Sequence, residues 1–372
     1  MSPAPYRILQ LASSSDMGGT ERMILFLTEA LDRAKFTPYV GALVGDGDLI
    51  RRSAPHCQQA RHFEFRFPGD PIALKNLVSF IRENRIDLVQ TYGLRADTAG
   101  RIAAKLGGAK VIVSSIRSID PWRRWHHTLL DKATASLVDM IISNSAAGRD
   151  AAIARREYPP EKIKVVYSGI PTRSIPRERR TRIRQELGLA PDAFPVIGIL
   201  ANLREMKGHE DVIEALPALR AGLPKLSFLF AGRDDSMGDI ESLARTTGVA
   251  DSIKFMGYVE DTTPLLAAMD FFMLPSHWEG LPVSVIEAMH AALPIITTRV
   301  GGIPELIRDR VDGLLIEPAN PIAITNAVFE LAQDTTLRHA LATSARERAM
   351  REFSVTAMTS KIEAIYGELL EK

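Results

Sequence analysis

Two glutamates eight positions apart, Glu279 and Glu287, flank the start of a predicted helix in the second half of the chain. Glu287 lies beside the apolar stripe of that helix, where a carboxylate needs a polar partner such as a sugar or ribose hydroxyl. Eight residues of continuous helix span about 12 Å, whereas glycosidase carboxyl pairs lie roughly 5 to 9 Å apart. The spacing therefore favours recognition of two parts of one ligand over a local acid and nucleophile. Between the glutamates, the amides of Gly280, Leu281 and Val283 could donate to anionic or hydroxyl oxygens.

Two cations, Arg204 and Lys207, lie in a glycine-containing loop between a predicted strand that ends at Ala201 and a helix that begins near His209. Doubly wound sheets bind ligands at the carboxyl ends of their strands. An arginine fork and a lysine point charge both suit phosphate oxygens. The pattern indicates a shared diphosphate, and the alternative is a solvated pair of loop cations.

Adjacent glycines follow predicted strands at Gly18-Gly19 and at Gly301-Gly302. Glycine allows a sharp turn and a close approach to a ligand, and the following helix directs its free N–H groups to the same point. Gly18 and Gly19 are therefore candidates for anion binding, with a structural turn as the alternative. The loop is not GxGxxG, so a dinucleotide site is weakly supported. At Gly301-Gly302, a structural turn and a phosphate or sugar contact are about equally favoured.

Length and composition are those of a folded protein with two domains. The chain has 372 residues, of which 46% are hydrophobic and 24% charged. Its net charge of +1 gives no indication of nucleic-acid binding, and a single cysteine, Cys57, excludes an internal disulfide framework. The N-terminus does not have the pattern of a signal peptide, and no stretch reaches the ~18 apolar residues of a membrane span. We expect a soluble, cytoplasmic protein whose membrane contact, if any, is peripheral.

Short apolar segments alternate with amphipathic ones throughout the chain, which predicts parallel sheets covered by helices on both faces. The two halves open alike, each with a strand, a polar glycine-containing loop and a helix, so we expect two doubly wound domains. The predicted strands are Tyr6–Leu11, Thr37–Leu43, Leu88–Thr91, Val111–Ser115, Met140–Ser143, Lys164–Val166, Pro195–Ala201, Ser227–Ala231, Ile253–Met256, Phe271–Leu274, Ile295–Thr298 and Gly313–Ile316.

Two cation-rich segments leave alternatives open. The stretch from Pro171 to Pro195 is predicted to be a linker followed by a short helix, and its basic run favours a solvated surface over contact with an acidic acceptor or an anionic membrane. The segment from Trp122 to His127 mixes aromatic and basic residues before a helix. A surface helix start is the simpler interpretation, and an acceptor or membrane-interface patch is the alternative.

Taken in order, several motifs give the chain a family resemblance. They are GGTER, SNS (Ser143–Ser145), VVYSGI (Val165–Ile170), LREMKG, FAGRDD (Phe230–Asp235), MGYVED (Met256–Asp261), HWEGLPVSVIEAM and TRVGGIPE (Thr298–Glu305). Over nearly its whole length the chain resembles family 4 retaining glycosyltransferases of the GT-B fold. The resemblance implies two Rossmann-like domains facing a central cleft: an acceptor-binding domain over 1–175, a nucleotide-sugar-binding domain over 176–353, and a helix over 354–372 that returns to the first domain.

The resemblance also implies roles for individual residues. Arg204 and Lys207 would hold the diphosphate and stabilise the departing charge, Glu279 would contact the transferred sugar, and Glu287 would bind the ribose. The remaining donor contacts would come from the Gly280 and Leu281 amides, from Gly18 and Gly19 near the phosphate, and from Tyr258 and Val259 near the base. No metal or other cofactor is expected.

One position departs from the family pattern. Many relatives have a histidine near the reacting sugar where this chain has Arg117. Arginine cannot act as a general base at ordinary pH, but it could bind an acidic acceptor or a phosphate. We therefore include Arg117 among the candidate catalytic residues.

The expected function is sugar transfer from a nucleotide-diphosphate donor, most often a UDP-sugar in this family, to a glycan or lipid-linked acceptor. Such transfer serves cell-surface polysaccharide or glycolipid synthesis. The alternatives are a nucleotide-sugar epimerase or a phosphorylase on the same fold, and a non-catalytic protein that binds a nucleotide sugar. The sequence does not specify the sugar, the linkage or the oligomeric state.

Overall fold

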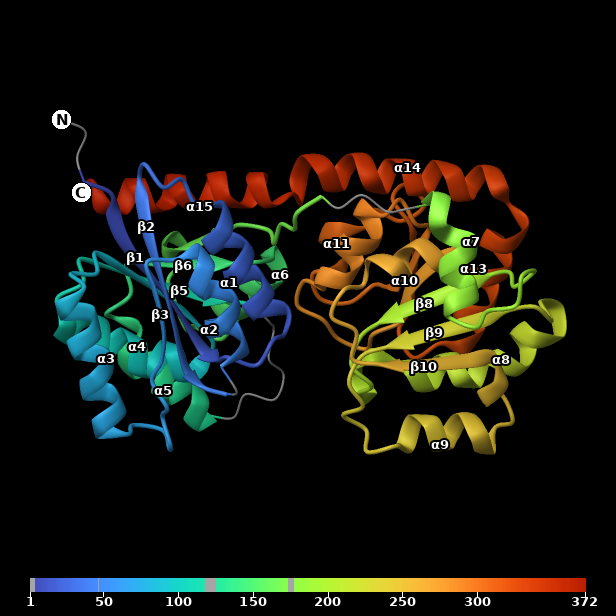
Figure 1. Ribbon diagram of the computed structural model, residues 1–372, viewed down its shortest axis with the longest axis horizontal. Helices are drawn as coiled ribbons and strands as arrows, with labels where there is room; N and C mark the ends of the chain where they lie inside the picture. The colour runs from blue at the N-terminus through green and yellow to red at the C-terminus, as the bar shows by residue number, and fades with distance from the viewer. Residues whose placement is uncertain (1–3, 46, 118–124, 173–176) are drawn as a thin grey trace. The chain divides into compact units, whose positions relative to one another are not determined.

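The chain divides into two compact units, each built around its own sheet (Figure 1). The computed structural model describes residues 4–45, 47–117, 125–172 and 177–372. Unit 1 comprises Met1–Pro171 and Glu352–Lys372, and unit 2 comprises Thr172–Arg351. The chain therefore leaves unit 1 for unit 2 and returns for its last helix. The segment from Trp122 to Arg124 and most of the linker at 173–176 lie outside the described residues.

Unit 1 contains a parallel sheet of seven strands in the order β3-β2-β1-β4-β5-β6-β7. Its strands are β1 (Tyr6–Ser14), β2 (Phe36–Val44), β3 (Gln59–His62), β4 (Leu88–Tyr92), β5 (Val111–Ile116), β6 (Met140–Ser143) and β7 (Ile163–Val165). Its helices are α1 (Gly19–Ala30), α2 (Asp48–Ser53), α3 (Pro71–Glu83), α4 (Leu94–Gly107), α5 (Trp125–Ala135), α6 (Ala146–Ala154) and α15 (Val355–Leu370).

Unit 2 contains a parallel sheet of six strands in the order β10-β9-β8-β11-β12-β13. Its strands are β8 (Val196–Leu200), β9 (Ser227–Ala231), β10 (Ile253–Gly257), β11 (Phe271–Leu274), β12 (Ile295–Thr298) and β13 (Leu314–Ile316). Its helices are α7 (Arg180–Glu186), α8 (His209–Gly222), α9 (Asp239–Thr246), α10 (Thr263–Ala268), α11 (Val283–His290), α12 (Ile303–Leu306), α13 (Pro321–Gln333) and α14 (Thr335–Glu352).

Each sheet is doubly wound, as the sequence predicts. The first strand of each unit lies in the interior, and the strand order reverses between β1 and β4 in unit 1 and between β8 and β11 in unit 2. Every residue of β4 and β8 is buried, which agrees with strands covered by helices on both faces. The two reversal points are where this fold class binds ligands.

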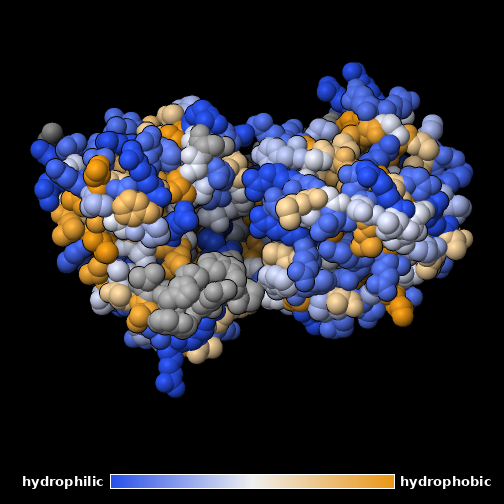
Figure 2. All heavy atoms as spheres, turned by 90° about the horizontal axis from the view of Figure 1, so that it is seen from below, coloured by the Kyte–Doolittle hydropathy of each residue, from blue (hydrophilic) through white to orange (hydrophobic). Residues whose placement is uncertain are grey.

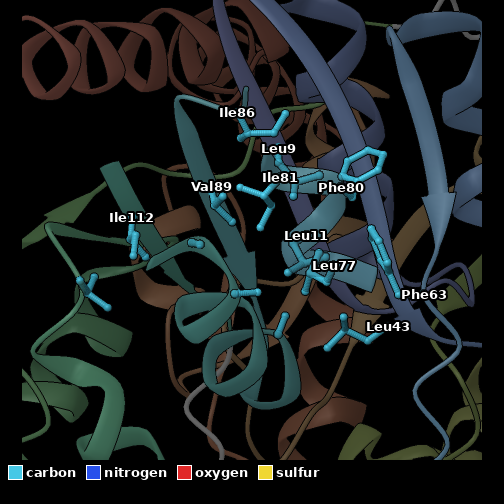
Figure 3. Close-up of a cluster of buried hydrophobic side chains, with 14 of the residues drawn as sticks. Leu9, Leu11, Leu43, Phe63, Leu77, Phe80, Ile81, Ile86, Val89 and Ile112 are labelled. Carbon is cyan, nitrogen blue, oxygen red and sulfur yellow. The ribbon is translucent and has the colours of Figure 1, made fainter. Parts of the chain in front are cut away.

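The unit 1 core lies between the sheet and the helices that cover it (Figure 3). Leu9 and Val89 of the sheet meet Leu77 and Phe80 of α3, and Phe63 packs edge-to-face on Phe80 with ring centroids 5.4 Å apart. On the face shown in Figure 2, hydrophilic side chains predominate and apolar ones are scattered among them. The buried apolar cluster stabilises the packing of α3 on the sheet and so holds in place the strands whose carboxyl ends lie together.

Local capping fixes where several helices begin. The Asp70 side chain accepts hydrogen bonds from the amides of Ile72 and Ala73 ahead of α3, with Pro71 at the first helical position. Ser354 accepts from the amide of Ala357 and so starts α15. Within unit 1, α15 packs against α1 (Figure 1).

Candidate functional site

The loops that follow β8, β11 and β12 lie close together at one edge of the unit 2 sheet. Gly208, with φ +69°, approaches so closely that a Cβ there would lie 2.2 Å from the Pro275 carbonyl oxygen. At Gly301, with φ +52°, a Cβ would lie 1.9 Å from the Glu279 carbonyl oxygen. The His277 amide donates to the Met206 carbonyl at 2.9 Å. Only glycine permits both the backbone conformation and the close approach at 208 and 301.

Lys207 and Glu279 form an ion pair at this edge. The Lys207 Nζ lies 2.5 Å from the Glu279 Oε1, and the Ser276 hydroxyl donates to the same oxygen at 2.8 Å. Glu279 is 7% exposed, so its charge depends on these partners. The Thr298 hydroxyl in turn donates to the Ser276 carbonyl at 2.5 Å. The structure thus brings together residues from the ends of three strands around one carboxylate.

Arg204 lies in the same loop as Lys207 but pairs elsewhere. Its Nε is 2.6 Å from the Asp235 Oδ2, and the Asn202 amide donates to that oxygen at 3.1 Å. About half of the Arg204 side chain is exposed. Asp235 follows β9 and was not among the predicted site residues, although it belongs to the FAGRDD segment. The sequence signal was its place just beyond a buried strand.

Glu287 lies on α11 and is nearly buried. The Thr262 hydroxyl is 3.5 Å from its Oε1. Thr262 ends the loop that carries Tyr258 and Val259, the residues expected near the base. Tyr258 is 55% exposed and therefore accessible to a ligand. The Glu287 carboxyl and the loop after β10 thus lie next to each other.

Unit 1 has a pocket of about 230 Å³ at its own reversal point. The ends of β1, β4 and β5 line it, together with α1 residues Thr20 and Glu21. Gly18 is the N-cap of α1 in an extended conformation, and a Cβ there would lie 2.9 Å from the Glu21 Oε2. Glycine at this position therefore makes room for the Glu21 carboxyl, and Gly19 begins the helix.

Burial raises the pKa of the Glu21 carboxyl to about 7. Hydrogen bonds from the Glu21 and Gly18 amides and the charge of Arg117 oppose this shift, and Asp16 adds to it. Near neutral pH the side chain is therefore divided between its neutral and charged forms. Sequence reasoning did not single out Glu21 from the GGTER segment, because burial decides its behaviour.

Arg117 follows β5 and reaches the same pocket. Its Nη2 donates to the Ser168 hydroxyl at 3.1 Å, whereas its Nε is buried without a hydrogen-bond partner. Burial lowers the pKa of the guanidinium, and electrostatic interaction with Tyr92 and Glu21 opposes this shift. The guanidinium nevertheless stays a cation at ordinary pH.

A second arginine at this pocket is fully committed to internal contacts. Arg101 of α4 is completely buried, and its guanidinium contacts Asp131 at 2.6 Å, the Tyr158 hydroxyl at 2.8 Å and the Ser114 hydroxyl at 2.9 Å. Asp97 lies 3.5 Å from it. No sequence pattern indicates this network, since its members come from α4, α5, β5 and the segment after α6. We interpret it as the contact that fastens α5 to α4.

No three or more histidine, cysteine, aspartate or glutamate side chains among the described residues are grouped so that they could hold a metal ion. Within the same part of the chain, no helix has the length and apolar character needed to cross a bilayer.

Comparisons with known proteins agree with this arrangement. Residues 17–174 match Glycosyltransferase Family 4, and residues 194–334 match Glycosyl transferases group 1. An Escherichia coli protein, UDP-Gal:alpha-D-GlcNAc-diphosphoundecaprenol alpha-1,3-galactosyltransferase, is 24% identical over 81% of this chain and 80% of its own length. The N-acetyl-alpha-D-glucosaminyl L-malate synthase of Bacillus anthracis is 28% identical, and there the match covers 57% of this chain and 55% of the relative.

Solved structures show the same fold. Anabaena HepE in complex with UDP-glucose has a TM-score of 0.86 at 23% identity, covering 97% of this chain and 99% of that one. A glycosyltransferase from Rickettsia africae has a TM-score of 0.85 at 18% identity over 99% of both chains.

Fold and family matches together define a glycosyltransferase with two Rossmann-like domains of the GT-B type. The chain belongs to glycosyltransferase family 4.

Proposed function

We propose that the chain is a retaining glycosyltransferase that moves a sugar from a UDP-sugar to a glycan or lipid-linked acceptor. The observation that carries this proposal is the group of Lys207, Ser276 and Glu279 at the reversal point of unit 2. A cation and a carboxylate held side by side at the carboxyl ends of the strands can bind the two parts of a sugar diphosphate. The cation binds phosphate oxygens, and the carboxylate accepts from sugar hydroxyls. The name of the Escherichia coli relative supports a UDP-sugar and a lipid-linked acceptor, and the Anabaena complexes support UDP and UDP-glucose.

In this proposal the donor replaces internal partners with its own groups. Lys207 leaves Glu279 for the diphosphate, and Arg204 leaves Asp235 for the same group, where both stabilise the charge that develops as the bond to the sugar breaks. Glu279 is then available to the hydroxyls of the transferred sugar. Each exchange replaces one polar partner with another, so Glu279 keeps hydrogen-bond donors, from Ser276 and the sugar hydroxyls, and Asp235 keeps the Asn202 amide.

The other predicted residues complete the donor site. Gly280 and Leu281 orient the sugar through their amides, Glu287 binds the ribose, and Tyr258 and Val259 contact the base. Gly18 and Gly19, at the start of α1 in unit 1, stay candidates for anion binding. The reaction is proposed to need no metal, since Arg204 and Lys207 supply the positive charge. Retention would follow from front-face attack, with no fixed protein nucleophile.

Turnover of variants tests the proposal. Lys207→Ala and Glu279→Ala should each lower sugar transfer by at least about 100-fold, the loss typical of a group that stabilises transition-state charge. Lys225→Ala is the matched control, because Lys225 forms only an exposed ion pair with Asp192. Undiminished transfer in both site variants would defeat the assignment.

Product analysis separates the rival activities. Transfer with retained anomeric configuration supports the proposal. A donor altered without any acceptor would indicate an epimerase. Donor binding with neither transfer nor hydrolysis would indicate a binding protein, an alternative motivated by Arg117 in place of the family's histidine.

A further inference from the structure

The unit 1 pocket holds one cation whose charge no described carboxylate neutralises at ion-pair distance. Three arginines line the pocket. Arg101 pairs with Asp131, and Arg155 pairs with Glu157 at 2.8 Å. For Arg117, the contacts among described residues are neutral: the Ser168 hydroxyl and, through its own carbonyl, the Asn144 amide. Arg117 is therefore the lining arginine that has no ion-pair partner among the described residues.

The guanidinium of Arg117 is also incompletely hydrogen-bonded. Its Nε is buried and lacks a partner, although leaving a buried polar atom without one is destabilising. Nε and Nη2 are two donors of one fork, and such a fork matches the two oxygens of a carboxylate or phosphate. An anionic group in the pocket would supply the missing acceptor and the missing charge together.

The rest of the pocket suits a sugar that carries such a group. Hydroxyls of Ser13, Ser14, Thr20 and Ser115 belong to the lining residues. They can donate to and accept from sugar hydroxyls. The pocket volume of about 230 Å³ is enough for one sugar ring, since a water occupies about 30 Å³ in the liquid.

Glu21 is a built-in competitor for this position. Its carboxyl lines the pocket and accepts hydrogen bonds from the amides at the start of α1. The charge of Arg117 lowers the pKa of this carboxyl. The charged groups that act on it are Arg117 and Asp16, and Tyr92 in turn acts on Arg117. Near pH 6 the carboxyl is mostly neutral and leaves the Arg117 charge to a ligand. Near pH 8 it is mostly ionised and competes with one.

We propose that Arg117 makes this pocket select an acceptor that carries an anionic oxygen group, a carboxylate or a phosphate ester, close to the hydroxyl that receives the sugar. The inference rests on the glycosyl transfer proposed above. Arg117 thereby serves in acceptor specificity.

Binding of three matched sugars tests the proposal. D-glucose, D-glucuronate and D-glucose 6-phosphate are titrated into the full chain saturated with UDP, so that the cations of unit 2 are occupied. At least one of the two anions should bind about 10-fold or more tightly than glucose. Arg117→Gln should weaken that anion by about 10- to 100-fold and leave glucose unchanged, as expected for loss of a charge-assisted hydrogen bond. Lys75→Gln, which removes an exposed charge elsewhere in unit 1, should change neither.

The two anions distinguish the source of the charge. Preference for glucuronate indicates a carboxylate acceptor, and preference for glucose 6-phosphate indicates a phosphate ester. If neither anion binds better than glucose, or if Arg117→Gln leaves their affinity unchanged, the proposal is wrong. Arg117→Lys keeps the charge without the fork, so its affinity for the preferred anion should lie between those of the wild type and of Arg117→Gln. This variant provides a readout if Arg117→Gln does not fold.

Glu21→Gln provides an independent arm. At pH 8 this variant should bind glucuronate several-fold more tightly than the wild type, and at pH 6 the two should bind alike. If Glu21→Gln and the wild type bind glucuronate with equal affinity at pH 8 as well as at pH 6, Glu21 does not compete with the ligand. UDP-glucose binding by the wild type is measured in parallel, and its failure would count against the proposed donor, whereas loss of anion preference alone would count against this inference.

Discussion

At the scale of single residues, the site depends on polar groups that partner one another before any ligand arrives. Glu279 is held by Lys207 and Ser276, and Arg204 by Asp235. The positions of Lys207, Arg204 and Glu279 in loops after buried strands, and of Glu287 within a helix, were predictable from the strand and helix pattern. Their roles in ligand binding stay predictions. Their partners were not predictable, since Lys207 and Glu279 are 72 positions apart and only the sheet order brings them together.

His209 offers a prediction at this scale. Its ring is fully buried against Phe230, both ring nitrogens lack hydrogen-bond partners, and burial, with Lys207 adding to it, lowers the pKa to about 4. In the unfolded chain the imidazole titrates near 6.5. Between these values the unfolded state binds more protons, so the free energy of unfolding falls as the pH falls.

Because of this histidine, the free energy of unfolding should fall by up to about 3 kcal/mol as the pH is lowered from 6.5 to 4. His209→Leu should remove most of that slope in urea unfolding measured at several pH values. His339→Leu, at an exposed position, is the control and should keep it. An unchanged slope in His209→Leu would show that the buried ring is not the cause.

At the scale of elements, close approach between loops explains residues that look interchangeable in the sequence. Gly208 and Gly301 lie where another loop's carbonyl would collide with a Cβ, whereas Gly18 makes room for a side chain of its own helix. The double-glycine patterns were predicted as turns or ligand contacts. The sequence could not show which atom each glycine accommodates, because that atom belongs to another segment or depends on the rotamer of a nearby side chain.

Most strands were predicted within two residues, but β3, α2 and α6 were missed. The edge strand β3 is polar and alternates between exposed and half-buried residues, so only its pairing with β2 reveals it. Ser145 is the N-cap of α6, and its hydroxyl accepts from the Gly148 amide. The helix itself is an alanine-rich run with little amphipathic signal.

Helix α15 allows a prediction at this scale. Tyr366 is fully buried, its ring meets Phe36 edge-to-face with centroids 5.8 Å apart, and its hydroxyl hydrogen-bonds with Gln10 and Gln90. Tyr366→Ala should cost about 3 to 5 kcal/mol, as for other large aromatic truncations. Hydrogen exchange measured by mass spectrometry should then speed up across β1 and β4.

The matched control for this change is Lys361→Ala, which alters an exposed residue of the same helix. Exchange in unit 2 should be unaffected by either variant, because α15 belongs to unit 1. Slow exchange of β1 in Tyr366→Ala would mean that α15 contributes little to that unit.

At the scale of the whole molecule, the chain repeats one architecture twice and places polar residues at the reversal point of each copy. The prediction of two doubly wound domains is confirmed, with seven strands in the first sheet where the sequence indicated six. Alternating strands and helices encode this class directly. The return of the last helix is a property of topology, for which a sequence pattern gives only an unpaired amphipathic segment.

The central claim is that unit 2 binds a nucleotide-sugar donor through Lys207. The most direct test is the melting temperature of the wild type, Lys207→Ala and Lys225→Ala with a panel of nucleotide sugars. A donor at 100 times its Kd stabilises the folded protein by about 2.7 kcal/mol. We predict that a UDP-sugar raises the melting temperature of the wild type and of Lys225→Ala by several degrees but not that of Lys207→Ala. No shift with any nucleotide sugar, or an equal shift in Lys207→Ala, would contradict the account.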